Sequence, residues 1–178
     1  MLKNAVIENC QKLYLKLRLK EADLHEMRKL SLISLLCFLA LGLKGQTLSI
    51  YKSSKTVEET TAIVEGIIKG MKLIYFETVP HDNIAAKRGV KIDPMREILF
   101  EDADLTTALI ECQPTTALDL PLKVLIWEEN EDVYISFIDP KFMKKRFMLT
   151  GCEEIVDDMG ILLSKVVVDA MRAIQAQD

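Results

Sequence analysis

The sequence predicts an α+β domain, a two-layer sandwich in which helices cover one face of a mostly antiparallel sheet. Three observations predict this class. Residues 122–128 and 133–138 are apolar, β-favouring runs separated by an acidic turn, as in a hairpin. Residues 153–174 place apolar side chains at helical spacing. A second helix has a recognisable start near Thr56. Hairpin strands and two substantial helices are buried most economically in two layers.

Length and composition agree with one ordinary domain. The chain has 178 residues, 49% apolar and 28% charged, with 7 Gly, 5 Pro and 4 Cys. This excludes collagen, a disordered polyelectrolyte, a polytopic membrane protein and a small disulfide scaffold.

The N-terminal part is unlike the rest. Residues 30–43 are uncharged and follow Arg28 and Lys29. A spanning helix needs about 20 apolar residues, so this shorter run fits a secretory signal, which we expect at 27–45. Residues 1–26 are then a misassigned start, with translation beginning at Met27, or a cytoplasmic extension. We expect export to the periplasm or cell envelope, with no stable membrane span after cleavage. The alternative is a helix at 30–43 that anchors the protein on the cytoplasmic side.

Residues 46–178, the expected domain, are acidic. They hold 15 Lys and Arg against 23 Asp and Glu, a net charge of −8. An acidic surface repels nucleic acid, so we expect no nucleic-acid partner.

The first half of the domain begins with a short alternating strand at 47–51. Thr56 and Glu59 form a capping box that starts a helix, and Gly70 suits the left-handed residue that closes it. Residues 73–79 predict a strand ended by Pro80, followed by a loop and short helix at 81–89.

The second half begins with a strand at 95–100, an acidic turn at 101–104 and a helix at 105–112. Pro114 starts a further turn through 118. The strand 122–128 is nearly apolar and is expected in the sheet centre. After the hairpin, Asp139 and Pro140 predict the start of a short helix through Phe147. Thr150 and Glu153 predict a capping box for the long closing helix.

Two cysteines, Cys112 and Cys152, lie in the domain. They could pair in an oxidising periplasm, but the sequence gives no Cα separation. Since no C-x-x-C motif is present, neither a thioredoxin-type site nor a zinc knuckle is indicated. We favour two small apolar residues with free thiols.

His81, beside Asp82, is a candidate general base or ligand. The chain has two histidines, His25 and His81, so a two-histidine metal site within the domain is excluded and we predict no metal centre. A single axial histidine for haem stays open. A surface histidine without a chemical role is the favoured interpretation.

Four charged residues could bind an anionic group: Asp119, Lys123, Glu128 and Arg146. Lys123 on an apolar strand needs a partner, which we expect to be Asp119 or Glu128. Arg146 could bind a carboxylate or phosphate, although a salt bridge to the acidic turn 129–132 is the simpler expectation. Trp127 and Tyr134 are expected to pack across the hairpin.

The run ALDLPLKVLIWE at 117–128, followed by VYISF at 133–137 and DPKFMKKR at 139–146, resembles the DUF302 family, also called TT1751-like. VPHDNIA at 79–85 matches another family segment. The resemblance covers about residues 47–176 and implies a TBP-like β-α-β(4)-α two-layer fold and a homodimer. It implies no activity. Phe147 departs from the family, where many members have a histidine after the arginine.

The sequence therefore predicts an exported, non-catalytic module that binds a small molecule or a partner protein. The alternative is a His81-dependent enzyme or haem-type ligand binder, in which Asp119, Lys123 and Arg146 hold an anionic group. The identity of the ligand or cofactor is left open.

Overall fold

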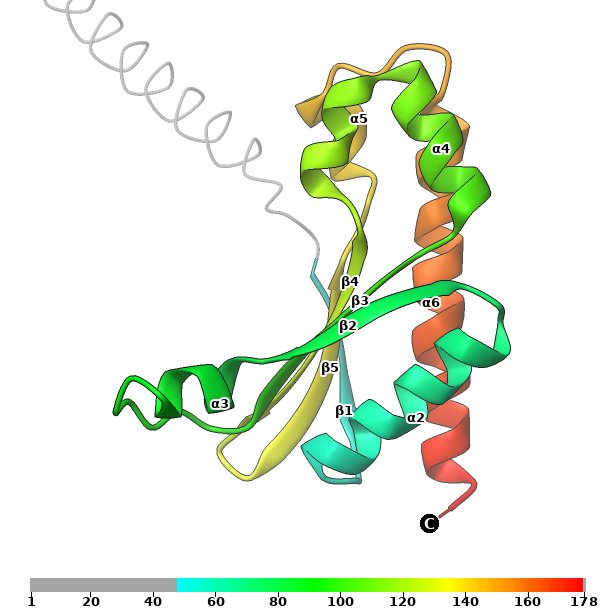
Figure 1. Ribbon diagram of the computed structural model, residues 1–178. Helices are drawn as coiled ribbons and strands as arrows, with labels where there is room; N and C mark the ends of the chain where they lie inside the picture. Colours follow the sequence, from blue (N-terminus) through cyan, green and yellow to red (C-terminus); the bar gives the residue numbers. More distant parts are fainter. Residues whose placement is uncertain (1–47, 178) are drawn as a thin grey trace, which may run out of the picture. The chain divides into compact units, whose positions relative to one another are not determined.

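Five antiparallel strands form one sheet in the order β1-β5-β4-β3-β2 (Figure 1). The computed structural model describes residues 48–177, so the predictions for residues 1–26 and 27–45 lie outside the described part. The strands are β1 Leu48–Ser53, β2 Ile74–Pro80, β3 Met95–Glu101, β4 Leu122–Glu129 and β5 Asp132–Ile138. The central position of β4 and its hairpin with β5 are confirmed.

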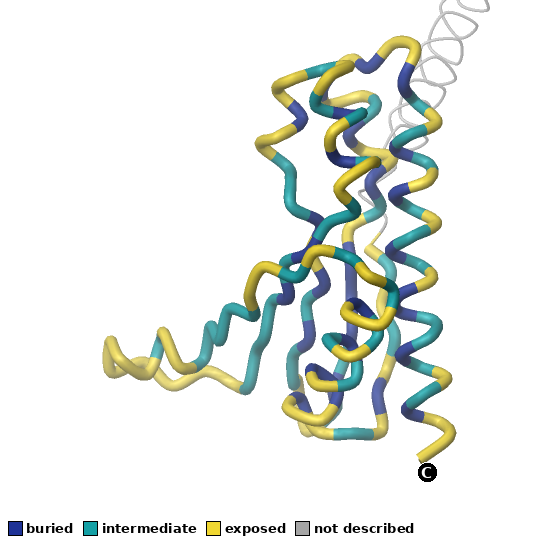
Figure 2. Tube along the Cα trace, turned by 45° about the vertical axis from the view of Figure 1, so that its right-hand side comes forward, coloured by how far each residue is buried: buried dark blue, intermediate teal, exposed yellow. Residues whose placement is uncertain are grey.

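Two long helices, α2 Val57–Gly70 and α6 Glu153–Gln175, cover one face of the sheet (Figure 1). Alternate residues of each strand point to them, and these side chains form the core. Figure 2 shows the buried residues of α6 following one side of the helix. Fully buried members of the core include Val64, Ile98, Phe100, Val124, Ile126, Ile135, Val156, Met159, Val166 and Ala170. The predicted two-layer α+β class is therefore confirmed.

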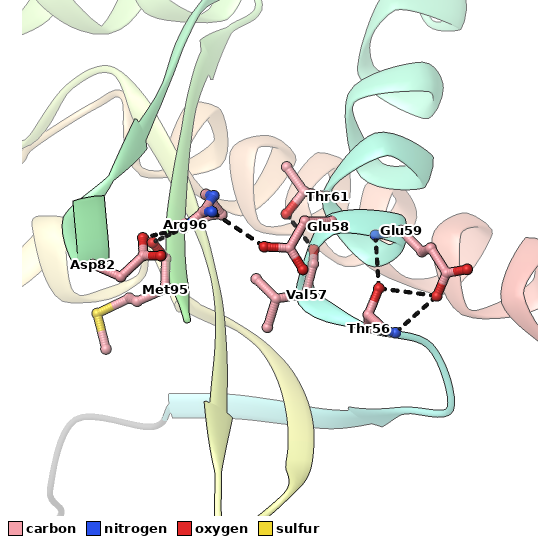
Figure 3. Close-up of polar contacts among 8 residues, drawn as sticks. All are labelled: Thr56, Val57, Glu58, Glu59, Thr61, Asp82, Met95 and Arg96. Atoms are coloured by element: carbon pink, nitrogen blue, oxygen red, sulfur yellow. Dashed lines mark hydrogen bonds and ion pairs between the residues drawn. The ribbon is translucent and has the colours of Figure 1, made fainter. Parts of the chain in front are cut away.

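The helix α2 begins with the predicted capping box (Figure 3). The Thr56 amide donates to Glu59 Oε2 at 3.0 Å, and the Glu59 amide donates to Thr56 Oγ1 at 3.2 Å. The end of this helix differs from prediction. Gly70 is its last helical residue, and the left-handed conformation falls two residues later, at Lys72 with φ 61°. The reversal comes there because the Met71 amide still bonds back into the helix, at Ile67.

A projecting arm is formed by the ends of β2 and β3 and the short helix α3 His81–Ala86 (Figures 1 and 2). Arg96 links the base of this arm to α2. This side chain, 14% exposed, donates to Asp82 of α3 and pairs with Glu58 Oε1 of α2 at 3.2 Å (Figure 3). Because one guanidinium holds two carboxylates from different elements, α3 is fixed relative to the helical layer.

Three short elements gather at the other end of the sheet: α4 Ala103–Cys112, η1 Pro114–Asp119 and α5 Phe142–Arg146 (Figure 1). Asp102 caps α4, accepting from the amides of Asp104 and Leu105 at 3.0 Å each. The helix α4 packs against α6 and η1. The connections that flank the β4–β5 hairpin therefore meet at one end of the domain.

A disulfide joins Cys112 and Cys152, so the prediction of two free thiols is wrong. Packing of α4 against α6 brings the last residue of one to the start of the other, with the two Cα atoms 6.5 Å apart. This lies inside the range that a disulfide requires. Forty positions separate the two cysteines in the chain. Local sequence patterns therefore do not indicate that they lie close together.

Two helices, α5 and α6, begin later in the chain than the sequence predicts. Asp139 does cap a turn, accepting from the Lys141 amide at 3.0 Å, but α5 begins only at Phe142. Thr150 is not the N-cap of α6: Cys152 takes that position, without a side-chain cap bond. The positive φ of Gly151, 84°, reverses the chain between Thr150 and the helix, so the threonine cannot reach the first turn. Among the described residues, no helix combines the length and hydropathy needed to cross a membrane.

Candidate functional site

A cavity of about 410 Å³ lies where β4 begins and β5 ends, between η1 and α5. Its lining is mainly apolar and comes from all four of these elements, together with β1, β3 and α6. The apolar members are Leu48, Leu118, Pro121, Leu122, Leu125, Trp127, Phe137, Ile138, Pro140, Phe142, Met143 and Leu163, and the polar members are Glu97, Asp119, Lys123, Ser136, Asp139 and Arg146.

The cavity runs from an exposed lip to a buried interior. Leu118 and Ile138 are 81% and 54% exposed, whereas Met143 and Leu163 are 4% and 2% exposed. An exposed apolar lip that leads to buried apolar side chains is the form of a site that takes an apolar group out of water.

The two walls of the cavity are η1 and α5, and local hydrogen bonds position each of them. In η1, Pro114 occupies the first turn, and the Thr116 hydroxyl donates to the Gln113 carbonyl at 2.7 Å. In α5, the Met143 amide donates to the Pro140 carbonyl at 2.8 Å, which turns Met143 into the interior. Both walls are thus short helical segments that have a proline at or just before their start.

Asp119 and Arg146 meet at the cavity, one from each wall. Arg146 Nη1 lies 3.0 Å from Asp119 Oδ1 and donates to Asp119 Oδ2 at 3.1 Å. The expected salt bridge from Arg146 to the turn 129–132 is wrong. That turn is at the opposite end of β4, and Asp132 there binds Lys52 Nζ at 2.8 Å.

Lys123 also lines the cavity, and it reaches Asp119, one of its two predicted partners, through the backbone carbonyl. Its ammonium donates to the backbone carbonyls of Pro121 at 3.0 Å and Asp119 at 3.4 Å, rather than to a carboxylate. Glu128 cannot reach it, because the two positions differ by an odd number and point to opposite faces of β4. Lys123 needs no buried ion pair, since its side chain lies on the open face of the sheet and is exposed.

His81 is outside the cavity lining. Its Nε2 lies 3.6 Å from Glu97 Oε2, while the adjacent Asp82 binds Arg96. Glu97 itself belongs to the cavity lining. Of the five candidates, the structure brings together Asp119, Lys123 and Arg146, and leaves His81 and Glu128 outside.

The predicted cross-strand packing is confirmed. Trp127 and Tyr134 are paired in the β4–β5 register, with ring centroids 5.3 Å apart and planes 30° apart. Lys123, Leu125 and Trp127 share the open face of the sheet, as their two-residue spacing predicts.

The apolar lining is what the sequence analysis missed. The sequence predicts a turn at Leu118 and a short helix at Phe142, with no role for either residue. The available signal was that large apolar residues occur in both short segments that flank the β4–β5 hairpin, next to Asp119 and Arg146. Two flanks of one hairpin end close together in space, so their apolar residues could have been assigned to one site.

The chemistry of the cavity lining is that of apolar side chains with charged groups among them. No histidine or cysteine is among the described residues that line the cavity. Within residues 48–177 there is also no cluster of three or more His, Cys, Asp or Glu that could hold a metal ion. An apolar cavity with cations at its rim can hold an apolar molecule that carries a negative group.

Comparison with known proteins places this fold in a family. Residues 50–169 match the family model "Domain of unknown function DUF302". In structure, the chain is similar to an uncharacterized conserved DUF302 protein from Bacillus stearothermophilus. The TM-score is 0.65 at 15% identity, over 69% of this chain and 97% of that one. At this identity the likeness shows a shared fold.

Two curated relatives match part of the chain. Fluoride-specific ion channel FluC 1 of Brucella suis biovar 1 (strain 1330) is 30% identical over 99 residues, 55% of this chain and 39% of that protein. Fluoride-specific ion channel FluC 1 of Brucella abortus biovar 1 (strain 9-941) is also 30% identical over 99 residues, with 37% of its length covered. The chain thus spans less than two-fifths of these relatives. With the family model matched over two-thirds of its length and the fold shared, the chain belongs to the DUF302 family.

Proposed function

We propose that this domain is a non-catalytic binding module for a small apolar molecule that carries an anionic group. The cavity between η1 and α5 carries the proposal. Its volume of about 410 Å³ falls in the range of about 300–1,000 Å³ typical of small-molecule sites. Its interior is formed by buried side chains such as Leu122, Met143 and Leu163, which would contact an alkyl chain or ring.

The lining holds two cations, Lys123 and Arg146, and three carboxylates, Glu97, Asp119 and Asp139, so the support for an anionic group on the ligand rests on the two cations alone. Lys123 donates to two carbonyls, which orient its ammonium but do not neutralise its charge. Arg146 is held at the lip by Asp119 and keeps further N–H donors, since a guanidinium has five. A carboxylate bound between these two cations would have charge-assisted hydrogen bonds, while its apolar part is removed from water.

Calorimetric titration with hexanoate, octanoate and decanoate tests this proposal. If the alkyl chain enters the cavity, each added methylene contributes about 0.8 kcal/mol, or about a fourfold gain in affinity. Lys123→Met should weaken all three ligands, and Leu125→Trp, which fills the cavity, should abolish the dependence on chain length. Ile84→Trp, on α3 outside the cavity, is the matched control and should bind as the wild type does.

Affinity that does not change with chain length would contradict the proposal. Equal losses in Leu125→Trp and Ile84→Trp would contradict it as well, since they would assign binding to general apolar surface.

We further propose that the open face of the sheet pairs with a second copy of the chain. Leu48, Ile50 and Ile138 are each about half exposed on this face. A two-fold axis through the face would place these apolar side chains of the two copies against each other and remove them from water.

Sedimentation equilibrium tests this pairing. The wild type should be a dimer and Ile50→Glu a monomer, whereas Ile84→Glu, which alters an equally exposed isoleucine on α3, should remain a dimer. A wild type that is monomeric at every concentration, or a loss of the dimer in both variants, would contradict it.

The module is proposed to work after export, in the periplasm or cell envelope. The uncharged run at 30–43 behind two cations supports this. The Cys112–Cys152 disulfide supports it too, because disulfides persist mainly in oxidising compartments. Intact mass of the protein from a cell-envelope fraction is the test: a chain shortened to a start near residue 43–46 is expected, and a chain that still begins at Met1 would contradict cleavage.

A further inference from the structure

The disulfide and the cavity share the same two walls. Cys112 is the last residue of α4, and the wall η1 begins two residues later at Pro114. Cys152 is the N-cap of α6, a few residues after the other wall, α5, ends at Arg146. The bond therefore ties the base of one wall to the base of the other.

Two further contacts join these walls, and both are weak. Gln113 Nε2 donates to the Phe147 carbonyl at 3.4 Å, near the limit of a hydrogen bond. The Asp119–Arg146 ion pair involves an arginine side chain that is 66% exposed, so solvent screens it. The covalent bond is accordingly the strongest tie between η1 and α5.

We propose that reduction of the Cys112–Cys152 disulfide loosens the cavity walls and lowers the affinity of the site, so that the redox state of this bond regulates ligand binding. The inference rests on the proposed binding function. A site whose walls are held in place before the ligand arrives binds more tightly, because less ordering is needed on binding. Separating the wall bases removes that preorganisation.

The two cysteine residues differ in exposure, and we expect this difference to set the order of the reaction. Cys112 is exposed, whereas Cys152 is 6% exposed. A thiolate of a dithiol reductant attacks the Cys112 sulfur, forms a mixed disulfide and releases Cys152 as a thiolate, which takes up a proton. The second thiol of the reductant then displaces Cys112. In total, two electrons and two protons pass to the protein, and the reductant becomes a disulfide.

Decanoate titration of the oxidised protein and of the same protein reduced by dithiothreitol tests the inference. Reduction should lower the affinity about tenfold while far-UV circular dichroism stays unchanged. Reoxidation should restore the affinity. Cys112→Ala with Cys152→Ala should bind like the reduced wild type and should not respond to dithiothreitol.

Hydrogen exchange gives a readout that does not depend on a ligand or on the variant folding. On reduction, exchange should accelerate in residues 114–120 and 142–151, with α2 and the sheet core unchanged. Equal decanoate affinity in both redox states would overturn the inference and leave the binding function standing. Exchange that rises throughout the domain would also overturn it, because the bond would then be a general stabiliser. No decanoate binding in either state would overturn both.

Discussion

Arg146 and Asp119 join the two walls of the cavity, with 3.0 Å between Arg146 Nη1 and Asp119 Oδ1. The arginine is exposed, so the pair contributes only about 0–1 kcal/mol to folding. Its larger effect is on ligand binding. The Asp119 carboxylate occupies some of the N–H donors of the Arg146 guanidinium and partly neutralises its positive charge.

Asp119→Asn should therefore bind decanoate more tightly than the wild type, since Arg146 is left with an unneutralised charge at the lip. Arg146→Met should bind it more weakly. Both should change the free energy of unfolding by less than about 1 kcal/mol. Calorimetric titration and urea unfolding measure the two effects. Weaker binding by Asp119→Asn would indicate that the carboxylate, not the cation, serves the ligand.

The start of α2 gives a stability test with an internal control. Thr56→Ala removes the cap seen in the capping box and should cost about 1 kcal/mol, within the range of about 0.5–2 kcal/mol for such caps. Thr150→Ala alters an exposed threonine that resembles a cap in sequence but does not cap α6, and should stay within about 0.5 kcal/mol. Equal losses in the two variants, measured by urea unfolding, would contradict this assignment.

Glu65 predicts a pH-dependent contribution to stability. Burial raises the pKa of its carboxyl, but hydrogen bonds from Thr78 at 2.6 Å and Lys69 at 3.0 Å outweigh it, so the pKa falls below the ordinary 4.5. A lowered folded-state pKa stabilises the protein above the unfolded-state value and loses this effect as the pH falls through the folded-state value.

Glu65→Gln should thus cost about 1 kcal/mol at pH 7. The difference from the wild type should narrow as the pH falls below 4.5. Urea unfolding at several pH values measures it, with Glu77→Gln, exposed on β2, as the control. A difference that is constant with pH would show that the charge of Glu65 plays no part.

Two residues of α6 that are close in sequence should differ in how much they contribute to stability. Met159 is fully buried, whereas Ile161 on the outer side is 66% exposed. Met159→Ala should cost about 2–5 kcal/mol, because it removes buried area and leaves a cavity. Ile161→Ala should change stability by less than about 0.5 kcal/mol. Thermal unfolding separates the two, and similar melting temperatures would contradict the placement of α6.

Local signals in the sequence were enough for most of the fold. The Thr56–Glu59 capping box needs only four consecutive residues, and the β4–β5 hairpin is two runs joined by one turn. Gly70 and Thr150 show where local rules fail. Each has the right residue type near a helix end, but a left-handed residue elsewhere, Lys72 or Gly151, decides where the chain turns.

The candidate site was predictable in part, for a similar reason. Two-residue spacing correctly put Lys123 and Trp127 on one face of a strand. By itself this spacing does not show that η1 and α5 meet, which follows only when the hairpin between them is taken into account. The disulfide between Cys112 and Cys152 depends on the same long-range packing of α4 against α6, so it too was hidden.

The position of a bound alkyl carboxylate tests the binding function most directly. Intermolecular nuclear Overhauser effects can be recorded between decanoate and methyl-labelled protein. We expect contacts from the alkyl chain to the methyl groups of Leu122, Met143 and Leu163, which line the cavity interior. Contacts confined to Ile50 and Ile84, which lie outside the cavity, or no contacts at all, would contradict the assignment of this cavity as the binding site.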